Sequence, residues 1–248
     1  MKKFGLIGHP IAHSLSPALF KAAYDGKYAY DLIEGEDFET SYRRFIEEYD
    51  AINVTAPFKE AAFAKAEILS EECASTGATN LLVKTPEGIK AYNSDFLGVR
   101  MWLSEVTEDL KGVKILIVGL GGAGKAAAAA AESLGMDVIR MNRTVRDCQT
   151  HPLDDFRKCF RKANIIIYNI PAAIPELKEL TDSDFNEDKP KLILEANYKD
   201  PALRETMESF GSKAVYTGGE TWLLYQAMTG YKILTGEKPD LTKMSDVL

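Results

Sequence analysis

The stretch that most constrains this chain is a short apolar segment followed at once by a cluster of glycines. Residues 113–118 are apolar except for Lys114, which is typical of a central parallel strand covered on both faces. Glycines follow at 119, 121, 122 and 124, and an alanine-rich segment with high helix propensity comes next. Strand, glycine turn and helix in this order predict a dinucleotide site, where the cofactor's pyrophosphate meets the N-terminus of the helix.

Each glycine of this turn has its own part in the prediction. Gly119 allows the sharp turn, Gly121 lets backbone approach the pyrophosphate, and Gly124 lets the helix pack closely on the strand. The alternative is a tight turn with only a structural role. The residues that we assign to the cofactor from this loop are Gly119, Gly121, Gly122, Ala123 and Gly124.

The position of the loop within the 248 residues predicts two domains, because more than a hundred residues precede it and need a fold of their own. We expect an α/β fold with a substrate domain over 1–105, completed by C-terminal helices at about 221–248. A Rossmann-like cofactor domain is expected over 106–220. A formal net charge of −7 without a basic stripe argues against a nucleic-acid partner.

The remaining composition indicates a cytoplasmic protein. The three cysteines have no C-x-x-C spacing, and we expect reduced thiols. The three histidines have no ligand spacing, so no metal site is expected. The chain shows no signal-peptide pattern, and no apolar run approaches the ~18 residues needed to span a bilayer.

A predicted helix start near the N-terminus offers a first candidate binding group. Ser16 fits the N-cap position and Pro17 the first helical position. Two hydroxyls at a helix N-terminus also suit a carboxylate, because donors and helix dipole both favour an anion. Ser14 and Ser16 are therefore candidate anion ligands, with a simple helix cap as the alternative.

A second group follows the strand expected at 51–55. Asn53 and Thr55 lie two residues apart, so their side chains share one face of that strand. Lys59 opens the helix expected at 59–65, where the positive end of the helix dipole repels its amine. Such a lysine is either solvated or held there for chemistry, and the polar pair before it is either a solvated strand end or a ligand site.

A third group precedes the helix expected at 96–105. Asp95 is an ordinary helix-start residue, and helix capping alone would explain it. However, polar groups at 14–16, 53–59, 80 and 93–95 all stand at the ends of expected strands. Ligands of open α/β sheets bind at such strand ends, so the four segments together favour a shared ligand site.

The cofactor's identity is predicted from the end of the strand expected at 137–141. An NAD site carries an acidic residue there, about 20 residues past the glycine turn, for the ribose 2′-hydroxyl. Here Asn142 and Arg143 take that place, with Thr144 and Arg146 nearby. A guanidinium pairs with a 2′-phosphate, so these four residues predict NADP(H). Exposed arginines without a role are the alternative.

These motifs, in this order, resemble the shikimate dehydrogenase family nearly from end to end. The matching segments are Ser14–Pro17, Asn53–Lys59, Gly77–Asn80, Asn93–Asp95, the glycine loop, Asn142–Thr144 and Leu223–Ala227. The resemblance implies NADPH-dependent, reversible reduction of 3-dehydroshikimate to shikimate, a step of chorismate and aromatic amino-acid biosynthesis. It also implies that the two domains face each other across a deep cleft.

The resemblance further implies a role for each candidate residue. Lys59 would act as the general acid/base, and Asp95 would orient it and bond the substrate hydroxyl. The remaining assignments are Ser14, Ser16 and Tyr198 for the substrate carboxylate, Asn53, Thr55, Asn80 and Gln226 for the ring hydroxyls, and Gly219 for the cofactor.

Two alternatives to this function remain open. One is a relative that also oxidises quinate or uses NAD, against which the missing strand-end acid argues. The other is a non-catalytic sensor of the same ligands, against which the retained Lys59 and Asp95 argue. We expect a monomer or homodimer. The chain departs from the family's usual sequence at several places. Ser94 stands where many members have Thr, Trp222 stands where Met is frequent, and Asn169–Pro171 replaces a small polar segment. Glu195–Tyr198 only loosely matches the Asp-x-x-Tyr pattern, and the region between 142 and 163 is short.

Overall fold

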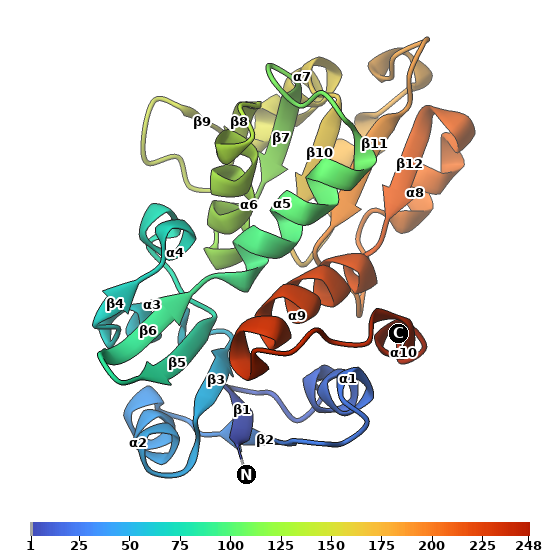
Figure 1. Ribbon diagram of the computed structural model, residues 1–248. Coiled ribbons are helices and arrows are strands. Elements are labelled where there is room, and N and C mark those ends of the chain that lie inside the picture. Colours follow the sequence, from blue (N-terminus) through green and yellow to red (C-terminus); the bar gives the residue numbers. More distant parts are fainter. Residues whose placement is uncertain (1) are drawn as a thin grey trace. The chain divides into compact units, whose positions relative to one another are not determined.

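The computed structural model describes residues 2–248, which form two α/β units, each built on a six-stranded sheet (Figure 1). The first unit comprises the chain up to Gly98 together with Leu224–Leu248, and the second comprises Val99–Leu223. Both boundaries fall inside helices, α5 (Ser94–Val106) and α9 (Gly219–Thr235). The boundaries expected at 105/106 and 220/221 lie in the same two helices.

The sheet of the first unit is mixed and has the strand order β2-β1-β3-β5-β6-β4. β1 runs parallel to β2 and β3, whereas β5 runs antiparallel to β3 and β6. The strands are β1 (Lys3–Gly8), β2 (Ala29–Glu34), β3 (Ala51–Val54), β4 (Ile68–Leu69), β5 (Leu81–Thr85) and β6 (Gly88–Tyr92). The helices wholly within this unit are α1 (Ser16–Ala23), α2 (Phe38–Glu48), α3 (Lys59–Ala64), α4 (Glu71–Thr76) and α10 (Leu241–Ser245).

Within the first unit, the start of α5 lies against the C-terminal part of α9 because both helices carry a glycine at the crossing. A Cβ on Gly98 would lie 2.7 Å from the backbone nitrogen of Gln226. A Cβ on Gly230 would lie 3.1 Å from the Ser94 side chain. The Thr229 hydroxyl also donates to the carbonyl of Ser94, at 3.4 Å. This close approach places the C-terminal part of α9 beside the polar residues that follow β6.

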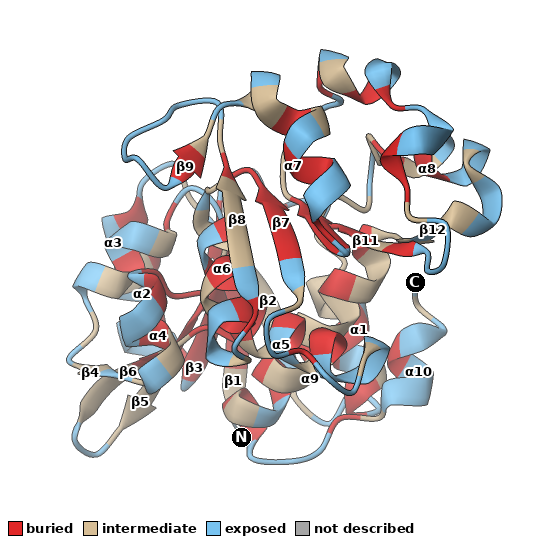
Figure 2. Ribbon diagram, turned by 90° about the horizontal axis from the view of Figure 1, so that it is seen from above, coloured by how far each residue is buried: buried red, intermediate tan, exposed pale blue. Residues whose placement is uncertain are grey.

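The sheet of the second unit is parallel throughout, with the order β12-β11-β10-β7-β8-β9. Its strands are β7 (Lys114–Val118), β8 (Asp137–Met141), β9 (Thr150–His151), β10 (Ile165–Tyr168), β11 (Lys191–Glu195) and β12 (Ala214–Thr217). Its helices are α6 (Gly122–Ser133), α7 (Phe156–Lys162) and α8 (Arg204–Ser209). The expected central strand is confirmed: Ile115–Val118 are fully buried in β7, and only Lys114 is exposed (Figure 2).

Strand and helix positions expected from the sequence agree with the structure to within a few residues at most ends. Three of the strands and α-helices were not expected: the two-residue strand β4, and β9 and α7 in the short region after residue 142. Between β10 and β11 the chain forms 3-10 turns at Pro175–Glu179 and Asp182–Asp184. The cysteines carry free thiols, as expected. Over the described part of the chain, no helix is long and apolar enough to cross a membrane.

Candidate active site

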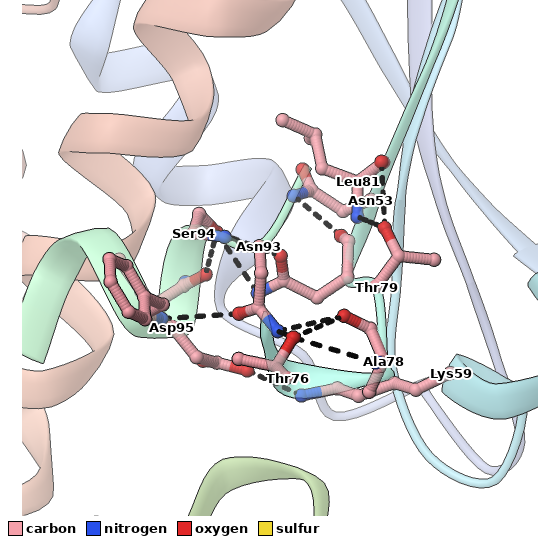
Figure 3. Close-up of polar contacts among 12 residues, drawn as sticks. Asn53, Lys59, Thr76, Ala78, Thr79, Leu81, Asn93, Ser94 and Asp95 are labelled. Carbon is pink, nitrogen blue, oxygen red and sulfur yellow. Dashed lines mark hydrogen bonds and ion pairs between the residues drawn. The ribbon is translucent and has the colours of Figure 1, made fainter. Parts of the chain in front are cut away.

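Lys59 and Asp95 form an ion pair in the first unit, although 36 residues separate them in sequence. Lys59 begins α3 and Asp95 lies in the first turn of α5, and their Nζ and Oδ2 atoms are 2.6 Å apart (Figure 3). The side chains are only 21% and 8% exposed. The carboxylate offsets the repulsion between the ammonium and the N-terminal end of α3. Lys59 is therefore held in place by a partner rather than solvated.

Helix capping, the alternative reading of Asp95, is carried out by a different residue. The Oδ1 atom of Asn93 accepts the N–H of Phe96 at 3.1 Å, and α5 begins two residues earlier than expected. The Nδ2 atom of Asn93 donates to the carbonyl of Ala78 at 2.9 Å, which fastens the helix start to the segment before β5. Because Asn93 satisfies the cap, the Asp95 carboxylate is directed at Lys59.

Beside this pair, Ser94 links two amide side chains that the sequence assigned to the substrate. Its backbone N–H donates to Asn80 Oδ1 at 2.7 Å, and its hydroxyl accepts from Asn80 Nδ2 at 3.0 Å. The same hydroxyl lies 3.2 Å from Gln226 Oε1. Ser94 is fully buried and orients both amides. Sequence reasoning missed this role, because it treated the residue only as a minor departure from Thr.

Asn53 is oriented by a tyrosine that the sequence did not indicate. The Tyr30 hydroxyl donates to Asn53 Oδ1 at 2.8 Å, and Asn53 Nδ2 points to the carbonyl of Asn80 at 3.4 Å. The Tyr30 ring packs on Phe20 with centroids 4.6 Å apart. Burial raises the pKa of Tyr30 well above its usual value, so the phenol stays protonated and donates. No pattern in the sequence indicated this contact.

The serine cap expected at the start of α1 is not formed, because Leu15 occupies the N-cap position and no side chain caps the helix. Ser16 is the first helical residue rather than the N-cap, and the Ser14 hydroxyl accepts the Ser16 N–H at 3.2 Å. The Ser16 carbonyl accepts from the Tyr231 hydroxyl at 3.0 Å, which ties α1 to α9. Both serines are half-buried. Thr55, also half-buried, follows β3 and donates its N–H to the carbonyl of Ile7 at 2.9 Å.

In the second unit, the glycine loop has the shape that a dinucleotide phosphate needs. Gly119 has a φ of +87°, the left-handed turn that favours glycine. A Cβ on Gly124 would lie 1.8 Å from the Gly119 carbonyl oxygen, so the helix start packs on the strand end. A Cβ on Gly121 would meet nothing within 4 Å, and α6 begins there without a side-chain cap. The loop therefore presents open backbone at a helix N-terminus, as a phosphate cradle does.

Other groups at this edge of the second sheet fit the same cofactor. Asn142 follows β8, and its Oδ1 accepts the N–H of Leu120 at 3.4 Å, which ties the strand end to the glycine loop. Arg143 and Arg146 are exposed in the same segment, with Thr144 between them. The carboxamide of Asn169 lies against the loop, and within residues 2–248 neither of its buried polar atoms has a hydrogen-bond partner. These residues would hold a phosphorylated dinucleotide.

The two remaining predicted residues also belong to the second unit. Tyr198 is half-buried in the loop after β11, and burial raises its pKa. A Cβ on Gly219 would lie 2.5 Å from the backbone of Tyr198, so that glycine packs directly on the Tyr198 loop. Among the described residues, no cluster of three or more His, Cys, Asp or Glu could hold a metal ion.

Comparison with known protein families gives one match in each part of the chain. Residues 6–82 match the model of the shikimate dehydrogenase substrate binding domain. Residues 97–194 match the NAD binding domain of D-isomer specific 2-hydroxyacid dehydrogenases.

Relatives that match nearly the whole chain show which family it belongs to. The chain is 30% identical to shikimate dehydrogenase (NADP(+)) of Thermotoga maritima, over 93% of this chain and 92% of that protein. It is 31% identical to the Staphylococcus aureus (strain bovine RF122) protein of the same name, over 98% and 96%. A shikimate dehydrogenase from Thermus thermophilus, solved with NADP(H) and shikimate, is similar with a TM-score of 0.80 and 25% identity, over 100% and 98%. This chain belongs to the shikimate dehydrogenase family.

Proposed function

We propose that this protein is an NADP-dependent shikimate dehydrogenase that interconverts 3-dehydroshikimate and shikimate. The observation that carries the proposal is the ion pair of Lys59 and Asp95, 2.6 Å apart, among oriented amide and hydroxyl side chains. The names of the relatives and the ligands of the Thermus thermophilus structure support the same substrate and cofactor.

The first unit supplies groups that match the substrate's functional groups. The hydroxyls of Ser14 and Ser16, at the start of α1, suit its carboxylate. The ring hydroxyls are proposed to bind the amide side chains oriented by Tyr30 and Ser94, together with Thr55. Those amides are Asn53, Asn80 and Gln226. Tyr198, from the second unit, is proposed to add a donor for the carboxylate.

Lys59 is proposed to move the proton of the reaction. When bound, the reduced nicotinamide supplies a hydride to the carbonyl carbon of 3-dehydroshikimate. Negative charge then develops on the carbonyl oxygen, and the Lys59 ammonium stabilises and protonates it. In the oxidative direction the neutral amine of Lys59 accepts the hydroxyl proton. Asp95, fixed at the start of α5, orients the amine throughout.

The second unit is proposed to hold the cofactor through its backbone and its arginines. The glycine loop and the start of α6 would take the pyrophosphate, and Arg143 and Arg146 would pair with the 2′-phosphate. The end of β8 carries Asn142 where an NAD site would carry an acid. NADP is therefore the proposed cofactor rather than NAD.

The test is the absorbance of the reduced nicotinamide after mixing purified protein with shikimate and NADP. We expect shikimate-dependent NADPH formation, with kcat/KM far higher for NADP than for NAD and for shikimate than for quinate. Folded protein that binds shikimate without turnover would instead indicate a sensor. The expected cytoplasmic location and a monomeric or homodimeric state remain predictions, the latter open to light scattering.

A further inference from the structure

The second unit contains a fully buried carboxylate outside the Lys59–Asp95 pair. Glu195 ends β11 and is 0% exposed. Its Oε1 accepts the N–H of Ala202 at 2.5 Å, and its Oε2 accepts the N–H of Leu203 at 3.1 Å and the hydroxyl of Tyr216 at 2.7 Å. A carboxylate removed from water is costly unless donors satisfy it, and here three donors do so.

These contacts close the loop of residues 196–203 at its base. Glu195 immediately precedes the loop, and the two N–H groups that it accepts stand at the end of the loop. Inside, Asn197 Nδ2 donates to the carbonyl of Asp200 at 2.6 Å, and Asn197 Oδ1 accepts the N–H of Lys199 at 3.2 Å. Tyr198 therefore lies in a loop that is fastened both at its base and at its tip.

The same carboxylate is connected to the start of α9. Burial and the contact with Glu195 raise the pKa of Tyr216, so its phenol stays a donor. The guanidinium of Arg204 lies over the Tyr216 ring, 5.7 Å from the centroid, and bonds to Glu220 at 3.4 Å. Glu220 directly follows Gly219, whose backbone packs on that of Tyr198. Contacts that run from Glu195 through Tyr216 and Arg204 to Glu220 therefore hold both the 196–203 loop and Gly219 in place.

We propose that Glu195 is a positioning residue, whose carboxylate fixes the 196–203 loop and thereby places the Tyr198 hydroxyl for the substrate carboxylate. The inference rests on the proposed function, because it assumes that Tyr198 contacts shikimate. An ionised carboxylate can only accept hydrogen bonds, which matches its three donors. The amide of a glutamine has the same shape, but its NH₂ group would face a donor and break at least one contact.

The test compares Glu195→Gln with a matched control, Asp184→Asn. Asp184 is also buried in the second unit and accepts from Arg157, Arg161 and the N–H of Thr181, but it lies in a 3-10 turn before β11. It therefore reports the effect of neutralising a buried carboxylate away from the Tyr198 loop. Should Glu195→Gln fail to fold, Tyr216→Phe removes one of the three donors with no change of charge.

The first readout is hydrogen exchange of the Ala202 and Leu203 amides, which does not depend on turnover. We expect exchange to accelerate about ten-fold or more in Glu195→Gln, in line with the loss of a charge-assisted hydrogen bond, and to stay unchanged in Asp184→Asn. Unchanged exchange in Glu195→Gln would overturn the proposal. A wild type that neither binds nor oxidises shikimate would refute the proposed function, while this readout still decides whether the loop is fastened.

The second readout is the KM for shikimate. We expect Glu195→Gln to raise it about five-fold with a smaller change in kcat, since a small misplacement of a binding group weakens the contact it makes. The increase should disappear in a Tyr198→Phe background, because both changes remove one interaction. An equal increase in Asp184→Asn, or full additivity with Tyr198→Phe, would contradict the positioning role.

Discussion

The two units build their candidate binding groups from different material. In the first unit, side chains from different elements hydrogen-bond to each other in pairs: Tyr30 of β2 with Asn53 of β3, Lys59 of α3 with Asp95 of α5, and Ser94 of α5 with Gln226 of α9. In the second unit, the glycine loop presents backbone groups, and Arg143 and Arg146, which follow β8, are exposed. Substitutions in the first unit should therefore act through the identity of a side chain, and those in the loop through shape or charge.

The largest effect is expected from Lys59→Ala. Removal of a positioned acid/base typically costs about 10²–10⁴ in rate, so kcat should fall by that factor while NADP affinity stays unchanged. Steady-state kinetics and a fluorescence titration with NADPH would measure the two quantities. The control is Lys65→Ala at the other end of α3, where the lysine is exposed and pairs with Glu39. Similar losses in both variants would show that Lys59 only stabilises the helix.

Two glycine substitutions in the second unit would separate the effect of the glycine loop on stability from its effect on NADP binding. In Gly124→Ala the added carbon would meet the Gly119 carbonyl oxygen at 1.8 Å, so we expect the unfolding midpoint to fall by about 5 °C or more and NADP binding to be lost. In Gly121→Ala the added carbon meets open space, so the midpoint should hold while NADP affinity falls. Calorimetry of unfolding and of binding separates the two. Wild-type NADP binding by Gly121→Ala would refute the phosphate cradle.

A smaller effect is expected from Arg143→Ala. Loss of one charge-assisted hydrogen bond to the 2′-phosphate should raise the KM for NADP about ten-fold and leave the KM for NAD unchanged. The control is Lys125→Ala, which removes a positive charge from the first turn of α6, outside the segment that follows β8 in sequence. Equal weakening of NADP and NAD binding in Arg143→Ala would mean that the guanidinium does not distinguish the two cofactors.

The smallest effect is expected from Tyr30→Phe in the first unit. The ring and its packing on Phe20 remain, but the hydrogen bond that orients Asn53 is lost, so the KM for shikimate should rise about two- to ten-fold. Tyr28→Phe is the matched control, because its hydroxyl bonds to the exposed Glu237 instead. A KM unchanged in Tyr30→Phe would mean that Asn53 is oriented without the phenol.

The sequence patterns predicted the fold, and the family resemblance implied the pairing of Lys59 with Asp95, but neither indicated the residues that orient the site. Strand periodicity, the glycine loop and the polar residues at strand ends are local patterns; they indicated the α/β fold and made Lys59 and Asp95 candidates, with solvation and helix capping as the alternatives. The contacts of Tyr30, Ser94 and Glu195 join segments 7 to 132 residues apart, and no local spacing reports them. The cap at α1 was misplaced, and so was that at α5, because neighbouring Ser, Asn and Asp residues all suit a cap.

The measurement that tests the account most directly is a crystal structure of this protein with shikimate bound. We predict that the hydroxyl to be oxidised lies roughly 2.6–3.2 Å from Lys59 Nζ and within reach of the Asp95 carboxylate. The substrate carboxylate should meet the hydroxyls of Ser14 and Ser16. Shikimate bound with the Lys59–Asp95 pair intact but turned away from every ring hydroxyl would contradict the assigned proton transfer.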